Sequence, residues 1–75
     1  MAYGFKDAAA LLPAELFTRG EERIAVRLLC GESRPEIAKD LRISENTVKT
    51  HSHRIFVKSK VGTQKEFMVK YLLKK

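Results

Sequence analysis

Apolar side chains recur along this chain at intervals of three and four residues, which is the spacing of an amphipathic α-helix. The pattern is clearest in four segments. It predicts helices from about Arg19 to Cys30, from Arg34 to Leu41, over residues 45–59 and from Gln64 to Leu73. No segment shows the sustained alternation of apolar and polar positions that is typical of a half-buried strand. The sequence therefore predicts an all-α fold built from four helices.

The residues that flank these segments favour the same boundaries. In a capping box, a hydroxyl and a carboxylate three residues apart each accept a hydrogen bond from the other's backbone amide. The motif occurs as Thr18 with Glu21, Ser33 with Glu36, and Thr63 with Glu66. Ser44 precedes the third helix as a plain N-cap. Gly31 is placed to end the first helix in the left-handed region, and Gly62 is expected to break the third.

Residues 1–16 lack a comparable pattern. We interpret them as an N-terminal arm or linker ahead of a single domain at residues 17–75. Within the arm, Asp7 is placed to cap a short turn that runs to Leu12 and is broken at Pro13. The chain has 75 residues, which is enough for one thin core and too few for a deep substrate cleft.

Charge is distributed unevenly between the two halves of the chain. Residues 1–41 carry six basic and seven acidic side chains, whereas residues 42–75 carry nine basic side chains against Glu45 and Glu66. Almost all of the net charge of +6 therefore lies in the second half. A focused basic region indicates a polyanionic partner, and nucleic acid is the commonest one.

Several kinds of chemistry are not supported by the residues present. The single cysteine, Cys30, allows no internal disulfide and suits a reducing, cytoplasmic compartment. His51 and His53 point about 200° apart on a helix, so they do not chelate one metal ion together. No nucleophile–base pair, phosphate-binding glycine loop or cofactor motif occurs, and no apolar run spans a membrane. We therefore expect neither an enzyme nor a metal or cofactor site.

The second and third predicted helices are joined by a short link, Arg42 to Ser44, and the third helix is basic. This is the helix-turn-helix arrangement, in which the first helix braces against the DNA backbone and the second enters the major groove. Apolar residues are available to pack the two helices together: Ile37, Ala38, Leu41, Ile43 and Val48. The arrangement predicts binding to double-stranded DNA.

From about Phe17 to Leu72 the sequence resembles the LuxR-type (GerE-like) helix-turn-helix domain of bacterial transcription regulators. The matching residues are Thr18, Glu21, Gly31, Ser33, Glu36-Ile37-Ala38, Ile43-Ser44-Glu45, Thr47-Val48-Lys49-Thr50-His51, Ile55, Lys58, Val61 and Glu66. The resemblance implies a four-helix domain whose third helix reads DNA and whose fourth helix provides the contact surface of a homodimer. It also implies a missing upstream receiver or sensor domain and RNA polymerase as a further partner.

The chain departs from the family pattern at three places. The family's Pro-Arg before the first glutamate is Arg19-Gly20 here, and the usual glycine between the paired helices is Arg42. The family's Lys-Leu-Gly-Val reads Lys58-Ser59-Lys60-Val61, so a core leucine is replaced by Ser59. None of these changes removes the DNA-reading helix. We expect their effect at the exit of the third helix and on the angle of the fourth.

The resemblance assigns DNA base contacts to Lys49, Thr50 and His53. Our candidates for phosphate contacts are Ser33, Arg34, Thr47, Arg54 and Lys58. Val69 and Leu73 are the predicted dimer surface, with the edge of the core as the other interpretation. His51 is expected to be a hydrogen-bonded, half-buried histidine.

Two other functions fit parts of the pattern. A promoter-reading domain of a sigma factor has a similar arrangement of residues, although the triplet Lys49-Thr50-His51 and a full fourth helix favour the LuxR type. A protein-interaction module that has lost DNA binding is compatible with Arg42 and Ser59, but the basic second half argues against it.

Overall fold

The computed structural model describes residues 5–13 and 15–73, in which every regular element is a helix. The elements are α1 (Phe5–Leu11), α2 (Arg19–Leu29), α3 (Arg34–Leu41), α4 (Glu45–Ser59) and α5 (Gln64–Leu72). The all-α prediction is confirmed, and each of the four predicted helices ends within one residue of its predicted boundary.

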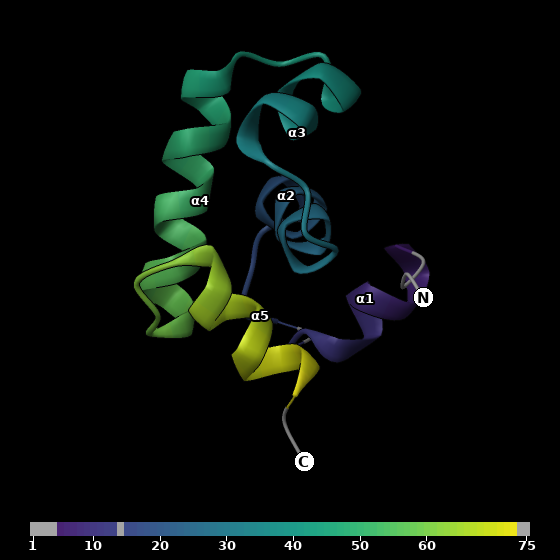
Figure 1. Cartoon of the computed structure of the whole chain (residues 1–75), viewed down its shortest axis with the longest axis vertical. Helices are drawn as coiled ribbons and strands as arrows, with labels where there is room; N and C mark the ends of the chain where they lie inside the picture. Colours follow the sequence, from purple (N-terminus) through teal and green to yellow (C-terminus); the bar gives the residue numbers. More distant parts are fainter. Residues whose placement is uncertain (1–4, 14, 74–75) are drawn as a thin grey trace.

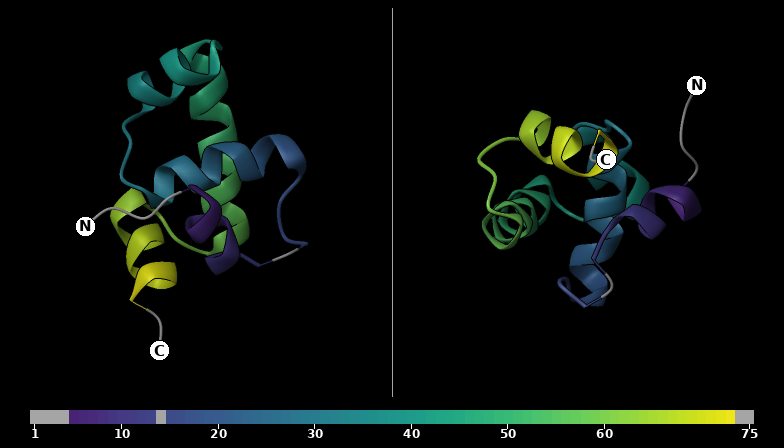
Figure 2. Two further views of the ribbon diagram at one scale, coloured as in Figure 1. Left: turned by 90° about the vertical axis from the view of Figure 1, so that its right-hand side faces the viewer. Right: turned by 90° about the horizontal axis from the view of Figure 1, so that it is seen from below.

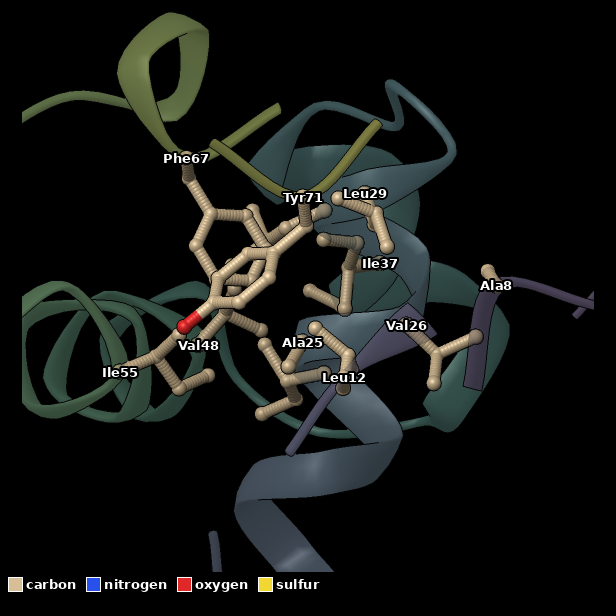
Figure 3. Packing of buried hydrophobic residues seen from close by; sticks show 13 residues of the cluster. Ala8, Leu12, Ala25, Val26, Leu29, Ile37, Val48, Ile55, Phe67 and Tyr71 are labelled. Atoms are coloured by element: carbon tan, nitrogen blue, oxygen red, sulfur yellow. The ribbon is translucent and has the colours of Figure 1, made fainter. Parts of the chain in front are cut away.

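Helix α2 lies at the centre of the fold. Seen end-on in Figure 1, it has α3 above it, α4 to the left and α5 below. It contacts α1, α4 and α5, while α3 packs on α4. Figure 3 shows the core that these helices share, where the rings of Phe67 and Tyr71 from α5 point toward α2 and α4. Phe67 and Ile55 are completely buried, as is Val48.

The N-terminal segment forms a helix where only a short turn from Asp7 to Leu12 was expected; this helix begins at Phe5, and Asp7 lies in its first turn. Among the described residues there are therefore five helices rather than four. Figure 2 shows α1 on the opposite side of α2 from α4. Ala8 is fully buried and Leu12 nearly so, and both belong to the common core. Two apolar positions one helical turn apart are too few to produce a recognisable period. Residues 1–4 of the predicted arm lie outside the described part of the chain.

Two of the three predicted capping boxes form completely. Thr18 Oγ1 accepts from Glu21 N at 3.2 Å while Glu21 Oε1 accepts from Thr18 N at 3.0 Å, and Ser33 and Glu36 do the same. At α5 only half of the predicted box is present. Thr63 Oγ1 caps Glu66 N, but the Glu66 carboxylate accepts from Gly62 N at 2.7 Å instead of from Thr63 N. Thr63 has a more extended φ of −141°, and the glutamate bonds the amide one residue earlier.

Three helices end at residues in the left-handed region. Gly31, with φ 90°, follows α2 as predicted. Arg42 (φ 58°) ends α3, and Lys60 (φ 61°) ends α4. The prediction that Gly62 ends α4 is therefore wrong, because the left-handed turn occurs two residues earlier. At both Arg42 and Lys60 a basic side chain occupies a conformation that glycine adopts at no steric cost.

Candidate nucleic-acid interface

Helix α4 has one packed face and one exposed face. Its inner face consists of Val48, Ser52, Ile55 and Ser59, all of which are buried. Residues spaced by three and four positions share a face of a helix. The opposite side is therefore formed by Asn46, Thr50, His53 and Val57, all exposed. We call these four residues the outer face of α4. A helix of 15 residues is about 22 Å long, which suits a major-groove reader.

Two of the predicted base contacts lie beside a predicted phosphate contact. Arg34 from the first turn of α3 and Lys49 and His53 from α4 line one groove of about 300 Å³. Its other lining residues are Leu28, Phe56, Gly62, Thr63 and Gln64. Gln64 is fixed there because its Nε2 donates to the backbone carbonyls of Leu28 at 2.9 Å and Glu32 at 3.0 Å. The groove thus joins cationic groups of α3 and α4 at the start of α5.

Three predicted contact residues use their hydroxyls in local hydrogen bonds. Ser33 is the N-cap of α3 and accepts from Glu36 N. Thr47 Oγ1 lies 2.8 Å from the hydroxyl of Ser44, the N-cap of α4. Thr50 Oγ1 donates to Asn46 O at 3.0 Å. These bonds restrict each hydroxyl, and at Thr50 the methyl group remains the apolar part of the side chain.

The remaining two predicted phosphate contacts differ in their surroundings. Arg54 is exposed. Lys58 forms an ion pair across the fold, with Nζ 2.5 Å from Oε1 of Glu21. The Glu21 side chain is only 5% exposed, and the hydrogen bond from Lys58 lowers the pKa of its carboxyl despite the opposing effect of burial. The structure therefore adds Glu21 as a partner of Lys58. No nearby motif in the sequence signals this pairing, because 37 positions separate the two residues.

His51 occupies the position expected of it. It is half-buried, and its Nδ1 lies 2.9 Å from the carbonyl oxygen of Thr47. The other side of the ring adjoins a small hollow of about 160 Å³ next to Gly20 and Arg23. The expectation of a hydrogen-bonded, half-buried histidine is confirmed.

The two predicted dimer residues are exposed at the end of α5. Val69 is 47% exposed and Leu73 is 68% exposed. They border an apolar groove of about 530 Å³ together with Gly31, Gln64, Lys65, Met68 and Leu72. Both side chains are therefore accessible in the single chain.

Cys30 is half-buried at the end of α2 and packs against the core. Burial raises the pKa of its thiol, which makes the nucleophilic thiolate scarce at neutral pH. Within residues 5–13 and 15–73 no helix is long and apolar enough to span a membrane. In the same part of the chain, no group of three or more potential metal ligands comes together.

Comparisons with known proteins agree with this geometry. The family described as "Bacterial regulatory proteins, luxR family" matches residues 15–70. The chain is 51% identical over 43 residues to the "CsgBAC operon transcriptional regulatory protein" of Escherichia coli (strain K12). It is equally similar to the "Probable csgAB operon transcriptional regulatory protein" of Salmonella typhimurium (strain LT2). Each match covers 57% of this chain and 20% of the relative. No solved structure matches.

The family match takes in α2, α3, α4 and all but the last two residues of α5, and it leaves α1 outside. Its members are transcription regulators, a class without enzymatic activity, and the helix pair α3–α4 has the arrangement that such regulators use to bind DNA. The chain therefore belongs to the LuxR family of bacterial regulatory proteins.

Proposed function

We propose that this domain binds a specific DNA sequence by inserting α4 into the major groove, as the output domain of a transcription regulator. The observation that carries the proposal is the division of α4 into a fully buried inner face and an exposed outer face. Such a helix presents its side chains to the groove without losing contact with its own core. Glu45 is the only acidic residue of α4, whereas Lys49, Arg54 and Lys58 are basic.

Base recognition is assigned to Lys49, Thr50 and His53. Lys49 donates to guanine O6 or N7, and the methyl group of Thr50 contacts a thymine methyl. His53 hydrogen-bonds to a base edge in its neutral form. All three residues are exposed, and Lys49 and His53 approach the DNA from the groove that they share with Arg34.

Phosphate contacts are assigned to Ser33, Arg34, Thr47 and Arg54. Ser33 and Arg34 lie at the N-terminal end of α3, where the helix dipole favours an anion. Contacts of this type position the protein without reading the sequence. Lys58, the fifth predicted phosphate contact, is held by Glu21, and we assign it primarily to that ion pair.

A homodimer on DNA fits the exposed apolar residues Val69 and Leu73 of the α5 end. An isologous pair of α5 helices would place two α4 helices on half-sites about one DNA turn apart. The matched relatives extend far beyond the aligned segment. We therefore propose that an upstream receiver or sensor domain controls the DNA-binding domain. We also propose that the protein contacts RNA polymerase and works in the cytoplasm.

Selection of bound duplexes from a random library tests the proposal. We expect one recurring motif, with an affinity that falls by about 0.9 log unit per log unit of salt for each phosphate contacted. Lys49→Ala should reduce the preference for guanine at one position by about 1–3 kcal/mol. Lys39→Ala, which removes an exposed cation from the last turn of α3 and leaves α4 unchanged, is the matched control. Binding without any sequence preference, or only in the presence of core RNA polymerase, would contradict the proposal.

A further inference from the structure

Asn46 stands at the start of the outer face of α4 and has no role in the fold. It is the second residue of the helix and is exposed. The helix cap is supplied by Ser44 instead, whose Oγ accepts from Thr47 N at 3.0 Å. Among the described residues, the Asn46 carboxamide has no hydrogen-bond partner, so its donor and its acceptor both remain available. The side chain is therefore free for recognition at no cost in folding.

Around the helix axis, Asn46 lies opposite the buried face of α4, although along the axis it is near the first turn. Asn46, Thr50 and His53 are separated by four and three residues, so they form one row along the helix. Val48 and Ile55, both fully buried, lie on the opposite side. Lys49 lies beside this row, about 60° around the helix axis from Asn46, and together with His53 it lines the groove that contains Arg34. When α4 faces the floor of the major groove, the row that begins with Asn46 is nearest to the base edges.

The hydrogen bond between Thr50 and Asn46 determines which group each residue of the row can present to DNA. Thr50 Oγ1 gives its proton to the backbone carbonyl of Asn46, which leaves the Thr50 methyl group as its readout of DNA. A methyl group recognises the methyl of thymine, and a carboxamide matches adenine by donating to N7 and accepting from N6. Asn46 and Thr50 are four residues apart, about 6 Å along the helix axis, whereas base pairs are spaced by about 3.4 Å.

We propose that Asn46 is a specificity-determining residue that reads an adenine through a bidentate hydrogen bond. This adenine lies within one or two base pairs of the thymine contacted by Thr50. The proposal rests on the proposed insertion of α4 into the major groove, and it adds a base reader that neither the charge pattern nor the row of basic residues indicates. It further implies that the operator contains an A·T-rich step opposite the first turn of α4.

Replacing the Asn46 carboxamide with a carboxylate tests the proposal, because we expect the base preference at one position to change rather than disappear. A carboxylate only accepts, so Asn46→Asp should disfavour adenine and favour cytosine, whose N4 amino group donates. We expect a relative change of roughly 5- to 100-fold at that position. Asn46→Ala should remove the preference at the same position and leave the others unchanged. The comparison is made within each variant's own selected library, because the added negative charge lowers affinity for every duplex.

Glu45→Gln is the matched control. Glu45 is the exposed neighbour of Asn46 but lies off the row, so its substitution should raise affinity evenly and keep the selected motif. If the wild-type domain selects no motif, the proposed function fails and this inference fails with it. If the wild type selects a motif and both Asn46 variants keep every position of it, the proposed function stands and the role of Asn46 is refuted. An even loss of affinity in Asn46→Ala also refutes it.

Discussion

Replacing Lys58 with methionine tests the ion pair that joins the beginning of α2 to the end of α4. Methionine retains most of the aliphatic chain and removes only the ammonium group. The Glu21 carboxylate then remains 5% exposed, with the backbone amide of Thr18 as its other hydrogen-bond donor. A buried carboxylate that loses its cation is destabilised by the cost of desolvation. The folded state, and not only DNA affinity, should therefore suffer.

The size of the effect follows from the exposure of the two partners. Breaking a fully buried ion pair from one side costs about 3–5 kcal/mol. The side chain of Lys58 is 36% exposed, so water partly hydrates the pair and screens it. We therefore expect a loss of about 1–2 kcal/mol, which in a domain of this size lowers Tm by roughly 5–15 °C. Lys39→Met, at an exposed position of α3, should change Tm by less than a third of that amount.

A double-mutant cycle with Glu21→Gln isolates the pair, because glutamine still accepts from Thr18 N but carries no charge. We expect the double variant to be more stable than the sum of the single changes predicts, by more than the roughly 0.3–0.5 kcal/mol within which independent sites add. Since Glu21 already holds the ammonium, the salt dependence of DNA binding should change by less than one unit in Lys58→Met. Lys58 would instead be a phosphate contact if the stability changes of the two single variants were additive and Lys58→Met lowered the slope of log affinity against log salt by a full unit.

Three shorter predictions concern the end of α3, the pH dependence of stability and the proposed dimer surface. Arg42→Gly relieves about 1–2 kcal/mol of left-handed strain against roughly 0.5–1 kcal/mol of added chain entropy, so Tm should rise by a few degrees; an unchanged or lower Tm contradicts this. Because the pKa of Glu21 is lowered in the folded state, its carboxylate stabilises the fold at pH values above its ordinary pKa of about 4.5. This contribution should disappear as the pH falls through the folded-state pKa. Burial raises the pKa of Glu32 and acts in the opposite direction, so the test is whether Glu21→Gln flattens the acid limb of a Tm–pH profile. Leu73→Asp should leave Tm unchanged but abolish the binding of two copies to a paired half-site duplex, measured by sedimentation; an unchanged stoichiometry places the dimer contact elsewhere.

The bounds of α2 to α5 and the capping boxes of α2 and α3 were predictable because they depend on local chemistry. The hydroxyl of Ser33 and the carboxylate of Glu36 are three residues apart at a helix start, which is the spacing of a capping box, and the structure has both bonds. Helix α1 was not predictable in the same way. Its two buried positions, Ala8 and Leu12, become apolar contacts only because α2 lies beside them. A short helix of this kind owes its stability to packing rather than to its own sequence.

In the candidate site, too, local features were predictable from the sequence and contacts between helices were not. Exposure of Lys49, Thr50 and His53 follows from the helical period of α4 and the burial of Val48 and Ile55. The partners of these residues across the fold do not follow from any period. The pairing of Lys58 with Glu21 and the groove that brings Arg34 beside Lys49 both depend on how α2 and α3 cross α4.

The replacement of a core leucine by Ser59 illustrates how the fold absorbs a departure from the family pattern. A buried hydroxyl is costly unless it is hydrogen-bonded, and Ser59, 1% exposed, accepts a 3.3 Å bond from the hydroxyl of Tyr71. Tyr71 in turn packs its ring edge-on against Phe67, with the ring centres 5.2 Å apart. The Lys70 ammonium donates to the backbone carbonyl of Ser59 at 2.5 Å. Polar contacts thus connect α5 to the exit of α4 where the family uses an apolar one.

This connection also bears on the proposed dimer. Tyr71 and Phe67 face the core from α5, so Val69 and Leu73, two residues beyond each of them, fall on the exposed side of the same helix. The bond between Tyr71 and Ser59 therefore acts together with the buried ring of Phe67 to orient α5 about its axis. In the proposed dimer that orientation decides which residues meet a second copy, so Ser59, which is itself buried, helps to position the proposed contact surface.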